Sequence, residues 1–170
     1  MAKKYLSELS LTKEQEKWVI GWLEKWGAWV RSGRLDKWQV NILGRLMDSV
    51  IAGEPSDPIC ADDEGLMISQ CVDQYFTEAD KELHFIVYGY YVNKMSINRL
   101  AVMLFDEIEP RLMKPCAGKT NVRKPSLKTV KRYVQERLDL ANIILHEMLL
   151  TGFIILKNGA KNRKNIKVRY

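Results

Sequence analysis

The stretch HFIVYGYYVNKMSINRLAVML (84–104), together with SLKTVKRYVQERL (126–138), decides the fold that we predict. The first stretch opens as an apolar segment ending in an aromatic pair, passes through the short turn NKMS, and resumes as a small helix that Ser96 can cap. The second stretch places Ser126 before a helical pattern with apolar residues at steps of three or four. This order is the layout of a helix-turn-helix of the sigma region 4 type, with the helix after Ser126 as recognition helix.

The face of this last helix opposite its apolar stripe is basic in the first turns. At i, i+3, i+4 and i+7 it carries Lys128, Lys131, Arg132 and Gln135. The major groove of DNA accepts a helix presented in this way, because lysine and arginine bind phosphates while amides and guanidinium groups read base edges. We therefore predict a DNA interface. Its members are Lys94, Ser96, Asn98, Arg99, Arg123, Lys124, Ser126, Lys128, Thr129, Lys131, Arg132 and Gln135.

Charge is divided unevenly along the 170 residues. Residues 1–83 hold 10 Lys/Arg and 15 Asp/Glu, a net charge of −5, whereas residues 84–170 hold 17 and 6, a net charge of +11. Such polarity favours a second half that binds nucleic acid and a first half with another task. The alternative is a helical domain whose basic face is simply solvated, because charge alone does not identify a partner.

The segment WLEKWGAWVRSG (22–33) holds three of the five tryptophans. With Trp18, they recur at steps of four, four and three, which is one face of a helix that Thr12 and Gln15 can open as a capping box. An aromatic stripe at helical spacing is more often core than a ligand cage. We therefore expect these rings to pack the interior.

Helical patterns account for most of the remaining chain. We expect a helix over about 36–52, a loop over 53–61, a helix to about Phe76 capped by Asp62 or Asp63, and a mostly buried helix opened by Thr77 with Asp80. The segment 106–125 is expected to be a long basic connector. The last helix is expected to end near Gly152 and to be followed by a possible short strand and a basic arm. The predicted fold class is all-α, with a helical body and the helix-turn-helix.

These elements divide into three predicted parts. Residues 1–61 form an acidic, tryptophan-rich N-terminal part, residues 62–152 the helical body with the DNA-binding unit, and residues 153–170 a basic tail. The sequence shows neither a secretory signal nor a membrane span of about 18 uninterrupted apolar residues, so we expect a cytoplasmic protein that does not contact membranes.

Neither a metal site nor a catalytic site is predicted. The three cysteines are widely spaced without a CxxC pair, so reduced thiols are favoured over a cluster of Cys60, Cys71 and His84. The acids Asp62, Asp63 and Glu64 could hold a metal in an enzyme, but acids at a helix start are more often caps. The sequence AGKT (117–120) lacks the preceding glycine and strand of a P-loop. We expect no cofactor.

Four motifs carry a resemblance to a known family. They are LEKWGAWV (23–30), PICADDEGLMISQCV (58–72), ELHFIVYGYYVNKMSINRLA (82–101) and KTVKRYVQERLDLANIILHEML (128–149). In this order they resemble the late-gene antitermination Q proteins of lambdoid phages, in the branch of phage 21. The resemblance covers about residues 20–150, and the segment 105–125 is an expansion that could itself touch DNA, RNA or polymerase.

The resemblance implies a function without catalysis. Such a protein binds double-stranded DNA at a phage late promoter, with more than one protomer on DNA as an open possibility, and loads onto paused bacterial RNA polymerase that still holds sigma factor. It then forms a ring that narrows the RNA exit channel around nascent RNA, so that pause and terminator hairpins cannot form. The alternative is a helix-turn-helix regulator that acts at a promoter and never travels with polymerase.

Overall fold

The computed structural model describes residues 10–33, 58–112 and 122–167. In chain order the elements are α2 (Lys13–Arg31), α4 (Asp62–Ala79), α5 (Lys81–Val87), the π-helix η2 (Tyr88–Val92), α6 (Ile97–Glu107), β1 (Arg111–Leu112), β2 (Val122–Arg123) and α7 (Leu127–Lys167). The predicted helix over 36–52, most of the loop over 53–61, the AGKT segment and Cys116 lie outside the described residues.

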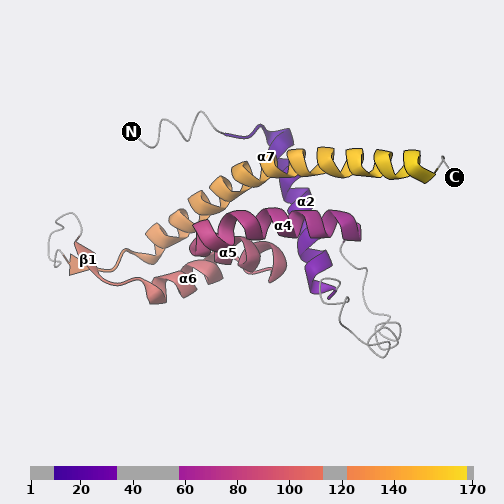
Figure 1. Ribbon diagram of the computed structural model, residues 1–170. Helices are drawn as coiled ribbons and strands as arrows, with labels where there is room; N and C mark the ends of the chain where they lie inside the picture. Colours follow the sequence, from indigo (N-terminus) through magenta and orange to yellow (C-terminus); the bar gives the residue numbers. More distant parts are fainter. Residues whose placement is uncertain (1–9, 34–57, 113–121, 168–170) are drawn as a thin grey trace, which may run out of the picture.

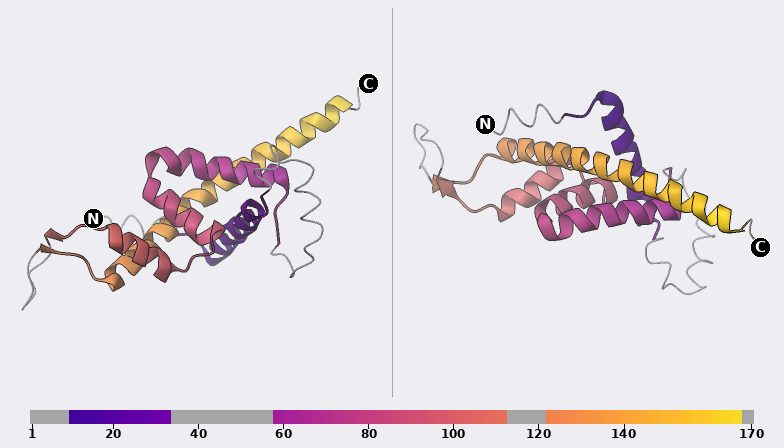
Figure 2. Two further views of the ribbon diagram at one scale, coloured as in Figure 1. Left: turned by 90° about the horizontal axis from the view of Figure 1, so that it is seen from below. Right: turned by 45° about the horizontal axis from the view of Figure 1, so that its top comes forward.

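The fold is helical, as predicted, and α7 is its longest element. In Figures 1 and 2, α7 runs along one side of α4, α5 and α6, and α2 crosses it near its middle. The buried side chains of these helices form one hydrophobic cluster that α2 shares with η2, α4 and α7. The predicted division into three parts stays a prediction, and the described core is continuous across residues 61 and 62.

Helix α2 confirms the predicted core position of Trp26 and Trp29, whereas Trp18 and Trp22 are only partly buried against the core. Its capping box is present, because Thr12 Oγ1 accepts from the Gln15 amide at 3.3 Å and the Gln15 side chain accepts from the Thr12 amide at 2.9 Å. Trp26 and Trp29 are 1% exposed. Both indoles also donate hydrogen bonds, from Trp26 to Ser69 and from Trp29 to Asp62, each at 2.9 Å. These rings therefore join α2 to α4 by both packing and polar contacts.

Helices α2 and η2 approach each other very closely. A Cβ atom at Gly27 would lie 2.0 Å from the Tyr91 carbonyl oxygen, so only glycine fits here. The π-helix changes the backbone bonding pattern of this segment. The Arg31 guanidinium donates to the carbonyl oxygens of Tyr91 at 3.1 Å and Val92 at 2.7 Å. Gly27 and Arg31, one turn apart on α2, thus fix the position of η2, which leads into the predicted turn.

Two predicted helix boundaries were wrong. The N-cap of α4 is Ala61, and Glu64 serves it by accepting from its amide at 2.9 Å, so neither Asp62 nor Asp63 is the cap. Helix α4 also continues past Thr77, and Asp80 alone caps α5 by accepting from the Leu83 amide. Several neighbouring side chains at each boundary could accept a hydrogen bond from the helix start. The sequence alone therefore does not decide at which residue each helix begins.

The predicted end of the last helix and the short C-terminal strand were also wrong, because α7 continues to Lys167. Gly152 does not end the helix. A Cβ atom there would lie 2.4 Å from Met67 Sδ, so this glycine lets α4 and α7 pack closely. Phe153 follows on the same helix and packs its ring 4.5 Å from that of Trp22. Tertiary packing keeps this stretch helical despite the glycine and the β-branched residues.

Part of the predicted connector is ordered as a ribbon. Strands β1 and β2 pair in antiparallel register, with Arg111 opposite Arg123 and Leu112 opposite Val122. The ribbon leaves the body between the end of α6 and the start of α7 (Figure 1). Residues 113–121 between the strands lie outside the described part of the chain.

In the described part of the chain, one helix is long and apolar enough to cross a membrane by length and composition, namely α7 over Leu127–Gly159. The stretch contains Asp139 and Glu147, and its inner face is buried against the other helices. The core helix of a globular protein has the same properties, so this is weak evidence for a span.

Candidate nucleic-acid interface

The first turns of α7 present the basic stripe as the sequence predicts. Ser126 caps the helix, because its Oγ accepts from the Thr129 amide at 3.3 Å and lies 2.9 Å from the Thr129 hydroxyl. The stripe faces away from the core, which receives Val130 and Val134. Lys128, Arg132 and Gln135 are exposed and Lys131 is half-buried. Basic side chains therefore flank a capped helix start that itself attracts phosphate.

Two members of the stripe make contacts along their own helix. Arg132 Nε lies 3.8 Å from Glu136 Oε1, and Gln135 Nε2 donates to Asp139 Oδ1 at 2.7 Å. The Arg132 and Glu136 side chains are 74% and 64% exposed, so this ion pair is weak. A phosphate can compete for such an arginine at little cost.

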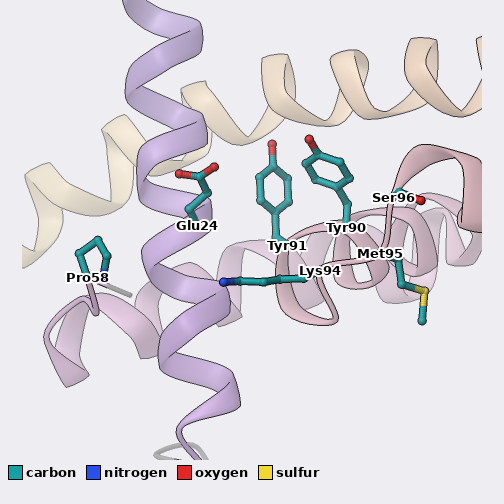
Figure 3. Close-up of a pocket in the computed structure, with 7 residues that line it drawn as sticks. All are labelled: Glu24, Pro58, Tyr90, Tyr91, Lys94, Met95 and Ser96. Atoms are coloured by element: carbon teal, nitrogen blue, oxygen red, sulfur yellow. The ribbon is translucent and has the colours of Figure 1, made fainter. Parts of the chain in front are cut away.

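The turn and the start of α6 hold four other predicted residues. Ser96 caps α6 by accepting from the Arg99 amide at 3.3 Å, and Asn98 is exposed in the first turn. Lys94 adopts a left-handed backbone conformation with φ of 50°. Lys94 and Ser96 also line a pocket of about 440 Å³ beside Tyr90 and Glu24. Figure 3 shows the Lys94 side chain extended across this pocket toward α2.

Lys124 is engaged within the fold. Its Nζ donates to the carbonyl oxygens of Phe105 at 3.4 Å and Asp106 at 3.3 Å, and it lies 5.4 Å from the centre of the Phe105 ring. A cation at the last carbonyl groups of a helix is stabilising. Lys124 thus attaches the base of the ribbon to the end of α6. The preceding residue, Arg123, lies in β2.

The predicted residues form two groups. Eight lie in the ribbon base and the first turns of α7, whereas Lys94, Ser96, Asn98 and Arg99 lie at the other end of α6 (Figure 1). Helix α6 has 11 residues, a length of roughly 16 Å at 1.5 Å per residue. Helices α6 and α7 pack against each other, so the two groups belong to neighbouring elements.

An ion-pair network holds α7 against the start of α5. The Arg137 guanidinium binds the Asp80 carboxylate, and Arg137 Nε lies 3.7 Å from Glu82. Tyr133 donates its hydroxyl to Glu82. Burial would raise the pKa of Asp80, but hydrogen bonds from Arg137 and the Leu83 amide outweigh it and hold this pKa below its usual value. Burial and the bond to Glu82 raise the pKa of Tyr133 to about 12.

The residues that could have formed a metal or catalytic site have other roles. Asp62 and Glu64 are engaged by Trp29 and by the Ala61 amide. Burial raises the pKa of the Cys60 thiol to about 11, and it also raises that of Cys71. His84 pairs with Asp73 at 3.2 Å. Among the described residues, no three histidine, cysteine or acidic side chains are placed to share a metal ion.

The sequence pattern of the family "Phage antitermination protein Q" matches residues 16–113, more than half of the chain. The chain belongs to the phage antitermination protein Q family. The matched range includes most of α2 and all of α4, α5, η2, α6 and β1, and it ends before α7. Among curated proteins no match was found.

Solved structures of this family extend the likeness to α7. The chain is similar to transcription antitermination factor Q21 in complex with Q21-binding-element DNA, at 38% identity over 92% of this chain and 99% of that one, with a TM-score of 0.66. It is also similar to the crystal structure of the bacteriophage 21 Q protein, at 37% identity, the same coverage and a TM-score of 0.65. The prediction of fold and family is thereby confirmed.

Three residues near the candidate interface were not predicted from the sequence. Gly27 and Arg31 set the position of η2 through contacts with a segment about 60 residues away, which local spacing does not show. Arg111 lies in the ribbon opposite the predicted Arg123, and local sequence patterns do not show that the two sides of the connector pair. A basic residue on each side of the connector was the available signal.

Proposed function

We propose that this protein is a phage transcription antitermination factor that binds double-stranded DNA at a late promoter. The observation that carries the proposal is its 38% identity, over 92% of the chain, to a Q factor whose structure holds its binding-element DNA. The capped start of α7 and its outward basic stripe supply the chemistry for such binding. The twelve predicted residues are the proposed DNA contacts, with Lys124 acting from the ribbon base.

The finer steps of the proposal concern RNA polymerase. After DNA binding, the protein loads onto paused bacterial polymerase that still holds sigma factor. It then narrows the RNA exit channel around nascent RNA, so that hairpins cannot form. Support comes from membership of the antitermination family and from the basic second half of the chain, which suits contact with RNA as well as DNA. The proposed place of action is the cytoplasm of the host bacterium, without catalysis or cofactor.

Transcription in vitro tests this proposal. The template carries the late promoter of the phage that encodes the protein and an intrinsic terminator downstream, and readthrough is measured with and without the protein. We expect readthrough that requires the promoter-proximal DNA. DNA binding without readthrough would instead identify a promoter-bound regulator, and the polymerase steps would be refuted.

Alanine variants connect this activity to α7. Lys128→Ala, Lys131→Ala and Arg132→Ala should each weaken DNA binding and reduce the slope of log Kd against log salt by about 0.9 per phosphate contact removed. Lys157→Ala is the matched control, because Lys157 is exposed toward the other end of the same helix. Unchanged affinity in all three variants would place the recognition surface elsewhere.

A further inference from the structure

The ribbon of β1 and β2 carries two arginines face to face. In its antiparallel register Arg111 is directly opposite Arg123. Side chains of directly opposite residues lie on the same face of a ribbon with Cβ atoms about 5 Å apart, and like charges in this position are destabilising. Each strand has only two residues, and Val122 and Arg123 each make a further interaction within the chain. Arg111 is exposed and Arg123 is half-buried, so a phosphate can approach two neighbouring guanidinium groups on this face.

The base of the ribbon is held in place by the body. Lys124 is bonded to the end of α6, and the next residue, Pro125, is buried before α7 begins. On the other strand, Ile108 packs against the core shortly before β1. The arginine pair is therefore presented from a fixed position, so that little ordering entropy is lost when it binds a ligand.

The ribbon lies beside the proposed recognition surface. Arg111 lines a cleft of about 300 Å³ together with Thr129 and Arg132 from the first turns of α7. The same cleft is lined by Glu82 and Glu136, which engage Tyr133 and Arg132. In Figures 1 and 2 the ribbon extends past the start of α7, away from α2 and α4. A duplex lying against the first turns of α7 would thus continue along the ribbon.

We propose that the ribbon is a DNA-binding wing, in which Arg111 and Arg123 bind backbone phosphates just outside the base pairs faced by α7. This inference rests on the proposed DNA binding and adds to it a second contact region and a residue, Arg111. The wing contributes affinity and register, because phosphate contacts position a protein without reading sequence. Arginine suits this task through its planar, bidentate donors.

The opposite face of the ribbon is apolar and solvent-exposed. Leu112 and Val122 form its cross-strand pair, and their exposed fractions are 78% and 58%. These side chains cannot bind phosphate. A ribbon that binds polymerase would use this apolar face, whereas a ribbon that binds DNA uses the arginine face. Substitutions on one face therefore test one partner without removing the side chains of the other face.

The test compares two duplexes. The long duplex carries the sequence that the full-length wild-type chain selects from a random pool, with its flanking base pairs, and the short duplex is trimmed to the base pairs contacted through α7. The double variant Arg111→Ala/Arg123→Ala should bind the long duplex more weakly. Its slope of log Kd against log salt should be smaller by about 0.9 for each of the two phosphate contacts removed. Between 50 and 200 mM salt this difference corresponds to about a twelvefold change in relative affinity. The affinity of this variant for the short duplex should equal that of the wild type.

The control variant removes the same charge elsewhere. Lys13→Ala/Lys157→Ala removes two exposed lysines, one at the start of α2 and one toward the end of α7, and should bind both duplexes as the wild type does. Arg111→Lys/Arg123→Lys should restore most of the salt slope. The melting temperature of the alanine variant is measured beside the affinities, so that a loss of folding is distinguished from a loss of phosphate contacts.

Several outcomes would overturn the inference. Wild-type affinity of the arginine variant for the long duplex, equal losses on both duplexes, or an equal loss in the lysine control would each refute a wing. Loss of readthrough in Leu112→Ser/Val122→Ser, with DNA affinity unchanged in the arginine variant, would assign the ribbon to polymerase. If the wild-type chain selects no sequence at all, the proposed DNA binding itself fails.

Discussion

Replacing Gly27 by alanine should destabilise the protein strongly, although alanine is the better helix former. The new Cβ would lie 2.0 Å from the Tyr91 carbonyl oxygen and 2.7 Å from its carbonyl carbon. Ordinary contact begins near 3.5 Å, so α2 and η2 must separate by more than about 1 Å. These atoms belong to backbone, which cannot turn aside as a side chain can.

The expected cost combines three contributions. Overpacking costs about 1–3 kcal/mol. The separation also weakens the two hydrogen bonds from Arg31 to the carbonyl groups of η2, and bonds of this charged kind contribute about 1.5–3 kcal/mol each. The gain in helix propensity is about 1 kcal/mol. We therefore expect Gly27→Ala to lower the free energy of unfolding by at least about 3 kcal/mol.

Gly21→Ala is the matched control, because it lies on the same helix and its Cβ would meet nothing within 4 Å. This variant should be more stable than the wild type by about 1 kcal/mol. Urea unfolding followed by circular dichroism measures both variants. Equal midpoints for the two alanines would refute the close approach of α2 and η2.

Three further variants test the core, the ion pair and the helix cap. Trp26→Ala should lower the free energy of unfolding by about 3–5 kcal/mol in urea titrations, and a stable variant would contradict its place in the core. Asp80→Asn should flatten the acid dependence of stability: the pKa of Asp80 is lowered in the folded protein, so its contribution is present above the unfolded pKa and is lost as pH falls through the folded value. Urea midpoints between pH 5 and 2 measure this, and parallel curves for variant and wild type would argue against the Arg137 pair. Ser126→Ala should cost about 0.5–2 kcal/mol in thermal unfolding, whereas no loss would mean that the cap is dispensable.

The elements that could be predicted from sequence are those in which local signals agree. Thr12 with Gln15 and Ser126 with Thr129 are short-range pairs, and the apolar spacing of α7 matches the residues that it buries. Each of these features is decided by residues within a few positions of one another. The proposed contacts of the α7 stripe follow from the same spacing and stay a prediction.

The features that escaped prediction depend on contacts between distant segments. Gly152 resembles a helix stop in the sequence, yet it meets Met67 of another helix and the helix continues. The π-helix is paired with Arg31, about 60 residues away. The pairing of β1 with β2 joins the two sides of a connector without an alternating pattern. Such contacts override local preference, and a single sequence does not reveal them.

The continuity of α7 sets a length scale for the whole molecule. Its 41 residues span a contour of about 60 Å at 1.5 Å per residue. That length equals about 18 base pairs of DNA at 3.4 Å each. The described helix contains no proline, so its two ends cannot move independently without bending the rod. If DNA binds the first turns of α7 as proposed, a partner at the C-terminal turns of the same helix is held within about 18 base pairs of that DNA.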